Sequence, residues 1–270
     1  MRKVLLSLLL GMLAVPLVAQ EYQLVFADEF DGNGRPDSTI WGYEQGFVRN
    51  HEAQWYQADN AYLHNGMLVI EARQETGREG IPYTSASMNT KGKYSFLYGR
   101  LEVCARIPTA GGAWPAIWTL GNDMPWPSCG EIDLMEYYRI NGVPHILANA
   151  CWGNDQPYKA VWNSKKTPFT HFTEKDPAWA QHFHIWRMDW DETAIRLYLD
   201  DELLNEIPLS TTQNGKIGQY TNPFNRPQYI LLNLALGGDN GGTIDNAAFP
   251  MRYEIDYVRV YQKKKYAHED

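Results

Sequence analysis

Cysteine is scarce in this chain. The 270 residues include three cysteines, Cys104, Cys129 and Cys151. An odd number allows at most one disulfide within the chain, and the spacing is not that of a zinc site. This excludes a small domain held together by disulfides, and we interpret the cysteines as small buried side chains.

Long apolar runs are also missing, except at the N-terminus. Arg2 and Lys3 precede the apolar stretch Val4–Val18 and the small residue Ala19, a pattern typical of a secretion signal and, at about 15 residues, too short to span a bilayer. We therefore predict a signal peptide over residues 1–20 and a secreted or periplasmic protein. No linker, repeat or low-complexity segment follows, which predicts one domain over residues 21–270. We also expect a monomer.

Basic residues are outnumbered. Lys and Arg total 24 against 32 Asp and Glu, giving a formal net charge of −8, which becomes −10 without Arg2 and Lys3. Such a balance disfavours nucleic acid or an anionic membrane as a partner. A neutral ligand remains compatible with it.

Helical periodicity is nearly absent, and strand signals recur instead. Leu101, Val103 and Ala105 alternate with polar or charged residues, and a similar alternation covers residues 195–200. Gly, Pro, Asn and Asp clusters separate these runs. The pattern predicts an all-β protein, built as an antiparallel sandwich or barrel.

Three acids stand in an apolar and aromatic run. Glu131, Asp133 and Glu136 fall within six residues, where a carboxylate is costly unless it is paired, hydrogen-bonded or protonated. A regular strand would place Glu136 on the opposite face from the other two. One extra residue, Leu134 or Met135, would form a bulge that brings all three acids onto one face.

Two carboxyl groups that flank one bond are what glycoside hydrolysis requires. A buried structural ion pair or a calcium site is the alternative interpretation of the same cluster. Aromatic residues favour a sugar ligand, because 10 Trp and 17 Tyr exceed what a sandwich core of this size needs, and Trp planes pack on sugar rings. Trp114 and Trp118 lie four residues apart and share a face if extended.

The chain resembles glycoside hydrolase family 16, the laminarinase and lichenase group, over most of residues 24–262. The segment 131–136 is similar to the longer, bulged form of the family signature. The other segments that follow the family order are Ala27–Asp31, Asn50–Tyr56, Thr90–Gly92, Tyr98–Arg100, Trp114–Gly121, Phe183–Trp186, Asn233–Gly238 and Asp256–Tyr261.

The resemblance implies a concanavalin A-like β-jelly roll in which two curved antiparallel sheets stack and the concave face binds sugar. It implies Glu131 as the nucleophile, Glu136 as the general acid/base and Asp133 as the assisting residue. Substrate contacts are expected from five further positions: Asn50, Glu52, Trp114, Trp118 and Trp152. Asn233 lies in the apolar run Ile230–Leu236 and must find hydrogen bonds, for which we expect a backbone partner, with a sugar hydroxyl as the alternative. For His184 we expect a structural role.

The resemblance also implies one structural calcium ion on the convex face, with Asp256, Glu29 and Gly66 as its positions. The alternative for Asp256 is a pair with an arginine. No cofactor is expected in catalysis, because two carboxylates need no metal.

These features predict a secreted endo-β-glucanase acting on β-1,3-glucan or mixed-linkage β-1,3-1,4-glucan. One alternative is a relative acting on agar, porphyran or carrageenan, and another is a non-catalytic glycan-binding protein. Many laminarinases carry an arginine associated with sugar binding at the position of Ser87. This departure leaves the linkage preference open.

Overall fold

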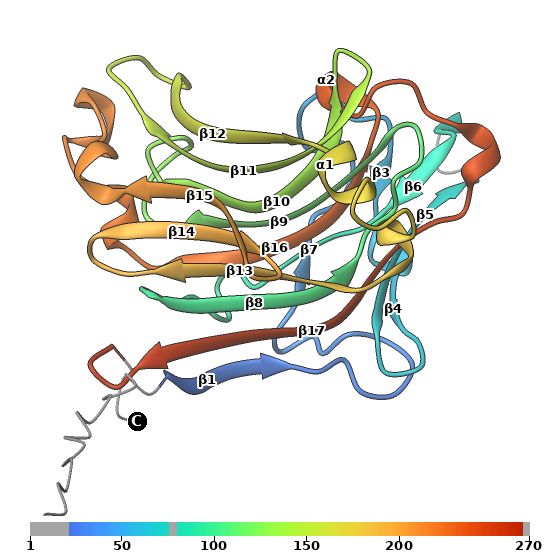
Figure 1. Cartoon of the computed structure of the whole chain (residues 1–270), viewed down its shortest axis with the longest axis horizontal. Coiled ribbons are helices and arrows are strands. Elements are labelled where there is room, and N and C mark those ends of the chain that lie inside the picture. The colour runs from blue at the N-terminus through green and yellow to red at the C-terminus, as the bar shows by residue number, and fades with distance from the viewer. Residues whose placement is uncertain (1–21, 76–79, 267–270) are drawn as a thin grey trace, which may run out of the picture.

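Two stacked β-sheets make up most of the structure (Figure 1). The computed structural model describes residues 22–75 and 80–266, so the predicted signal peptide lies outside the described residues. Within the described part of the chain, no helix is long and apolar enough to cross a membrane.

The first sheet has ten strands and contains both the first and the last strand of the chain. β1 pairs with β17, and β4 pairs with β5, beside the main path of the sheet. In order along that path, and then beside it, the strands are β15 (Glu202–Pro208), β14 (Ala194–Leu199), β13 (His184–Trp190), β8 (Gly99–Arg106), β17 (Met251–Lys263), β5 (Leu68–Gln74), β6 (Tyr83–Ser85), β3 (Trp55–Tyr56), β1 (Tyr22–Asp28) and β4 (Ala61–Leu63).

The second sheet has seven strands and lies behind the first in Figure 1. β12 forms one edge and β2 the other. In order, the strands are β12 (Ala160–Pro168), β11 (Val143–Gly153), β10 (Glu131–Ile140), β9 (Ala113–Gly121), β16 (Gln228–Leu236), β7 (Ser87–Asn89) and β2 (Gly42–Tyr43). The pairings between neighbouring strands are antiparallel, except that β3 runs parallel to β6.

Within residues 22–75 and 80–266, helical structure is limited to short turns between strands. The α-helices are α1 (Thr170–Thr173) and α2 (Gly238–Gly241), and the 3₁₀ turns are η1 (Ala58–Asn60), η3 (Trp179–Gln181), η4 (Leu209–Thr211), η5 (Lys216–Gly218), η6 (Pro223–Asn225) and η7 (Asn246–Ala248). The predicted all-β sandwich is therefore confirmed.

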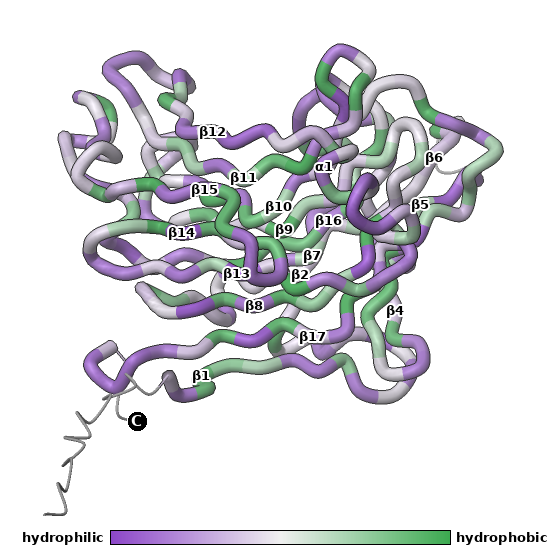
Figure 2. Tube along the Cα trace, viewed as in Figure 1, coloured by the Kyte–Doolittle hydropathy of each residue, from purple (hydrophilic) through white to green (hydrophobic). Residues whose placement is uncertain are grey.

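The core lies between the two sheets and follows from the alternation along each strand. In β8, Leu101, Val103 and Ala105 are fully buried, while the residues between them are partly exposed. This confirms the face predicted for that strand. β12 is different, because it is exposed along most of its length and hydrophilic (Figure 2). An apolar core therefore supports the sheets, while β12 forms a polar edge.

Candidate active site

The predicted bulge is present in β10. Asp133 pairs with Trp118 of β9, but the next pair is Met135 with Ile117, so Leu134 is the extra residue against β9. Against β11, the register also shifts between Asp133 and Glu136. Leu134 and Met135 are both fully buried in the core, and the bulge resets the alternation so that the acids share the opposite face.

All three acids line one cavity of about 750 Å³ on the face of the seven-stranded sheet that points away from the core. The remaining lining residues come from β9, β10, β11, β12, β16 and nearby loops. They are Arg49, Asn50, Glu52, Trp114, Ala116, Trp118, Leu120, Trp126, Tyr138, Asn149, Trp162, Ser164, Lys166, Asn233 and Asn240. We call this cavity the cleft.

Glu131 and Glu136 each accept a hydrogen bond from an indole. Trp126 Nε1 donates to Glu131 Oε2 over 2.8 Å, and Trp114 Nε1 donates to Glu136 Oε1 over 2.9 Å. Asn149 Nδ2 also donates to Glu136 Oε2 over 3.1 Å. Trp114, which we expected to pack on a sugar ring, thus also makes a polar contact with Glu136.

Burial raises the pKa of Glu131 and of Glu136, because the charged form loses hydration. The Trp126 hydrogen bond and the positive charge of Arg49 lower the pKa of Glu131 in part. At Glu136 the Trp114 hydrogen bond lowers the pKa, while the negative charge of Glu131 raises it. The two carboxyl groups therefore differ in the charges that act on them.

Asp133 is almost fully buried, at 2% exposure. Burial, followed by the charges of Glu131 and Glu136, raises its pKa well above the ordinary value. A hydrogen bond with Glu131 raises the pKa of Asp133 and lowers that of Glu131. The two carboxyl groups thus interact, and the pKa directions favour protonation of Asp133 over protonation of Glu131.

One end of the cleft contains most of the predicted substrate contacts. Asn50 and Glu52 line it together with Trp118 and Asn233. Asn233 does not bind backbone as we expected, because its side chain accepts a hydrogen bond from Trp118 Nε1 over 2.8 Å and donates one to Tyr56 Oη over 3.0 Å. The amide thus fixes the indole of Trp118 from the floor of the cleft.

The prediction for Trp152 is wrong. Asn149 lines the cleft, and strand alternation then turns Trp152, three residues later in β11, to the opposite face. Trp152 is 7% exposed and packs in the core, with its ring 6.5 Å from that of Phe224. It therefore supports the fold instead of contacting substrate.

The opposite end of the cleft is formed by β12, where sequence reasoning named no residue. Trp162, Ser164 and Lys166 line this end. They pair with Cys151, Asn149 and Leu147 of β11, in register with the acids of β10. Trp162 is 45% exposed. In the sequence, the only indication of this face was that Trp162 shares an alternating face with the polar residues Ser164 and Lys166.

Other residues that sequence reasoning missed are Arg49, Trp126 and Asn149. Arg49 and Trp126 belong to loops, so no periodicity places them. Asn149 did have a usable signal, because a polar amide in the apolar strand β11 must find partners in the folded protein.

The residues expected at a calcium site do not form a ready set of carboxylate ligands. Both oxygens of Glu29 accept hydrogen bonds from Arg259, each over 2.7 Å. Asp256 is exposed on β17, and across residues 22–75 and 80–266 no group of three His, Cys, Asp or Glu side chains could hold a metal. A calcium ion bound by the Glu29 side chain would have to displace Arg259.

The structural interpretation agrees with the surroundings of His184, Cys129 and Cys151, whereas Cys104 is only partly buried. The His184 ring stacks on Trp179, with centroids 3.8 Å apart, and its Nδ1 lies 3.0 Å from Asp200. Cys104, Cys129 and Cys151 are all free thiols. None of these contacts suggests a chemical role.

The bulged trio of acids in a cleft on a two-sheet sandwich defines a class of glycoside hydrolases. The family model for glycosyl hydrolases family 16 matches residues 47–259, and the chain belongs to this family.

Similar proteins include glucanases and an enzyme of mucin breakdown. A "Beta-glucanase" from Rhodothermus marinus is 35% identical over 256 residues, which cover 90% of this chain and 86% of that protein. SCLam, a solved non-specific endo-β-1,3(4)-glucanase, is 34% identical, with a TM-score of 0.77 and coverage of 90% of this chain and 92% of its own. A structure from work on endo-acting O-glycanases, with which human gut microbiota initiate mucin breakdown, is 32% identical, with a TM-score of 0.78 and coverage of 91% and 92%.

Proposed function

We propose that this protein is a secreted endo-β-glucanase that hydrolyses internal linkages of β-1,3-glucan or mixed-linkage β-1,3-1,4-glucan, with retention of configuration. The observation that carries the proposal is the bulge at Leu134, because it places Glu131, Asp133 and Glu136 on the cleft face. The glucanases among the similar proteins support the choice of substrate.

In the first step, the Glu131 carboxylate attacks the anomeric carbon while Glu136 gives its proton to the departing glycosidic oxygen. A covalent glycosyl-enzyme forms as the C–O bond breaks. In the second step, Glu136 removes a proton from water, the water attacks the anomeric carbon, and Glu131 leaves. This mechanism requires the two carboxyl groups to lie about 5–5.5 Å apart.

The surroundings of the acids support this division of roles. The charge of Arg49 and the hydrogen bond with Asp133 favour ionised Glu131, as a nucleophile requires. The negative charges of Glu131 and Glu52 favour protonated Glu136, as an acid requires. Formation of the glycosyl-enzyme removes the charge of Glu131, so Glu136 then ionises more easily and can act as the base.

The experiment is a substrate comparison with laminarin, barley mixed-linkage glucan, agarose and mucin, in which the linkage at each new reducing end is identified. We expect glucan oligosaccharides from one or both glucans, with internal cleavage from the first time point. Activity on agarose or mucin alone would contradict the proposal.

A second candidate is cleavage of the O-linked sugar chains of mucin. It is favoured by the similarity to the O-glycanase structure, whose TM-score is as high as that of the glucanase SCLam. Ser87, where many laminarinases have an arginine, is compatible with a different sugar. In the same comparison, release of oligosaccharides from mucin but not from laminarin would favour this candidate.

A non-catalytic glycan-binding protein is less well supported, since the chain retains all three acids. The predicted calcium ion and the monomeric state remain predictions. Metal analysis of the purified protein and light scattering in solution test them.

A further inference from the structure

Arg49 reaches into the cleft from the loop between β2 and β3. Its guanidinium carbon lies 5.0 Å from the centroid of the Trp118 ring, and the side chain is 26% exposed. Trp118 is the cross-strand partner of Asp133. The guanidinium therefore lies beside the acids, over the indole that the sequence had suggested as a platform for sugar.

The position of Arg49 is held by a small polar network. The Glu44 carboxylate accepts a hydrogen bond from Arg49, and it accepts another from Ser87 Oγ over 2.6 Å. Glu44 directly follows β2, whereas Ser87 belongs to β7, so two neighbouring strands fix the acid. This fixed carboxylate and the indole beneath restrict the guanidinium to one orientation.

Most donors of Arg49 remain available to a ligand. A guanidinium has five N–H donors, and among the described residues the hydrogen bonds of Arg49 go to Glu44 alone. Because the side chain lines the cleft, the other donors can meet a bound sugar. Trp118 has fewer groups available to a sugar, since Arg49 covers one face of its ring and the Trp118 N–H donates to Asn233.

The charges at this end of the cleft favour a neutral sugar. Glu44 balances the charge of Arg49, and Glu52 is a further acid 7% exposed in the same lining. A sulfate or carboxylate group on the substrate would meet these acids without an excess of positive charge. Sugar hydroxyl groups, in contrast, can accept hydrogen bonds from a paired guanidinium.

We propose that Arg49 is a specificity-determining residue, which donates hydrogen bonds to hydroxyl groups of the neutral sugar next to the one attacked by Glu131. In this role the Arg49 network, consisting of Arg49, Glu44 and Ser87, replaces aromatic stacking on Trp118 with hydrogen bonding. The inference rests on the proposed glucanase function.

The test compares Arg49→Gln, Arg49→Lys and a matched control, Arg106→Gln, on laminarin and mixed-linkage oligosaccharides. Arg106 also pairs with a glutamate, Glu254, and lies 5.2 Å over an aromatic ring, that of Phe183, but on the other sheet. For Arg49→Gln we expect kcat/KM to fall about 10- to 100-fold, as for a lost hydrogen bond to a charged group. The kcat/KM of Arg49→Lys should lie between those of Arg49→Gln and the wild type, and the kcat/KM of the control should equal that of the wild type.

Two further measurements separate sugar binding from support of the loop. Calorimetry with the inactive Glu131→Gln variant should show weaker binding of a neutral oligosaccharide once Arg49→Gln is added. The acid limb of the kcat/KM profile of Arg49→Gln should move to higher pH, because loss of the Arg49 charge raises the pKa of Glu131. If Arg49→Gln folds poorly, the double variant Glu44→Gln/Arg49→Gln removes both charges and serves instead.

The outcomes distinguish the two proposals. A wild type that cleaves glucan, together with an Arg49→Gln variant within about twofold of it in kcat/KM and binding, overturns the role of Arg49 alone. A wild type that cleaves no neutral glucan overturns both. If the wild type cleaves a sulfated polysaccharide faster than its desulfated form, the assignment of a neutral sugar is likewise overturned.

Discussion

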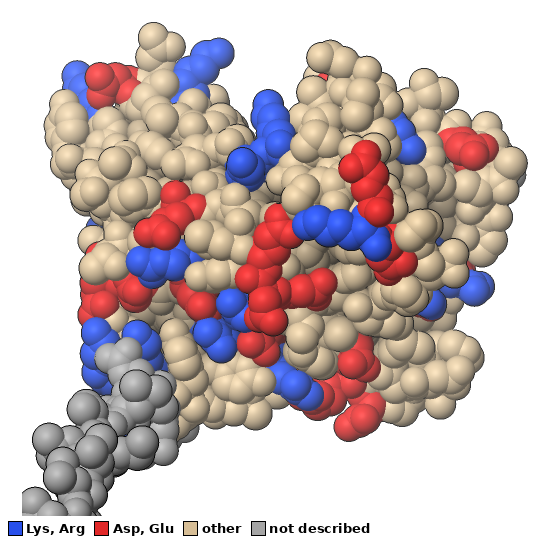
Figure 3. All heavy atoms as spheres, viewed as in Figure 1, with Lys and Arg blue, Asp and Glu red and all other residues tan. Residues whose placement is uncertain are grey.

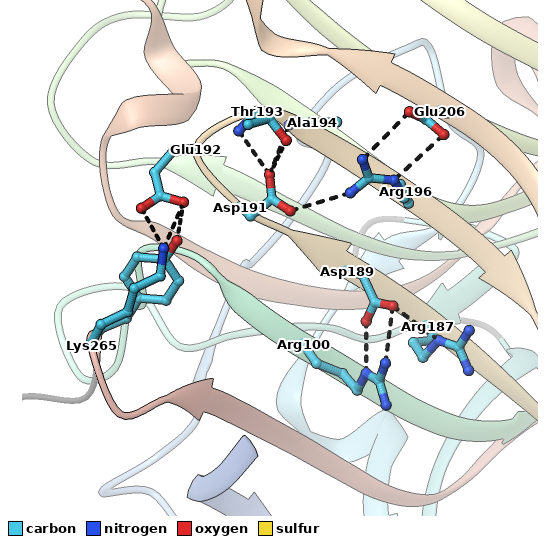
Figure 4. A network of polar contacts seen from close by, with 11 residues as sticks. Arg100, Arg187, Asp189, Asp191, Glu192, Thr193, Ala194, Arg196, Glu206 and Lys265 are labelled. Carbon is cyan, nitrogen blue, oxygen red and sulfur yellow. Dashed lines mark hydrogen bonds and ion pairs between the residues drawn. The ribbon is translucent and has the colours of Figure 1, made fainter. Parts of the chain in front are cut away.

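The acidic residues on the two exposed faces of the sandwich differ in their ion pairing. On the outer face of the ten-stranded sheet, acidic and basic side chains are interspersed (Figure 3). Arg100 donates to both oxygens of Asp189, over 2.7 and 3.0 Å, and Arg196 contacts Asp191 and Glu206 (Figure 4). In the cleft, Glu131, Asp133 and Glu136 form no ion pair among the described residues.

The pKa directions follow from this difference. Burial alone would raise the pKa of Asp191, but hydrogen bonds from Thr193 and Ala194 and the charge of Arg196 hold it below the ordinary value. Burial dominates at the three acids of the cleft, whose pKa values are raised. Asp191 thus stabilises the folded protein as an anion, whereas the three acids in the cleft are kept ready to exchange protons.

The strongest test of this contrast is Glu131→Gln. The change keeps the shape of the side chain but removes the nucleophile, so we expect hydrolysis to fall by about 10⁴-fold or more. Oligosaccharide binding, measured by calorimetry, should persist. Full activity in this variant would show that the nucleophile is another residue.

The second largest expected effect is the change of wild-type kcat/KM with pH. Activity requires ionised Glu131 and protonated Glu136, so kcat/KM should fall about tenfold per pH unit on both sides of its maximum. Burial raises both pKa values, which moves the pH of maximal activity above the pKa of an ordinary glutamate, about 4.3. Initial rates from pH 3 to 9 test this, and a maximum at about pH 4 would argue against buried acids.

Asp133→Asn should reveal the cost of keeping an acid in the cleft. Its folded-state pKa is raised, so wild-type stability is fully retained below the unfolded pKa of about 3.9 and falls as the pH rises toward the folded value. Asparagine does not titrate. We expect the stability of the variant to be nearly equal to that of the wild type at pH 4 and higher at pH 8, as measured by urea unfolding.

The smallest expected effect is that of Asp189→Asn on the outer face. The change breaks the bidentate pair with Arg100 and should destabilise the fold by about 1 kcal/mol or less, since ion pairs at the protein surface contribute little even when they are partly buried, as this one is. The loss should shrink in 1 M salt, roughly as screening predicts, with kcat/KM unchanged. Reduced activity at equal stability would show that the two faces are coupled.

The parts of the site that lie on strands were predictable from the sequence. Alternation required a bulge at Leu134 or Met135, and the structure contains it. The prediction for Trp152 was wrong because it did not take into account which side chains of β11 face the cleft. The polar Asn149 in the same strand indicates that face. For Arg49 and Trp126 no local rule applies, since loop residues reach the cleft only through contacts with distant strands.

The polar edge strand β12 has a consequence for association between molecules. An exposed edge offers unpaired backbone N–H and C=O groups to the strand of another chain, and charged side chains discourage such pairing. Lys165 and Lys166 are exposed on this strand, and Lys166 also lines the cleft. Substitutions made at β12 to change substrate preference therefore act on self-association as well, and apolar ones should favour aggregation.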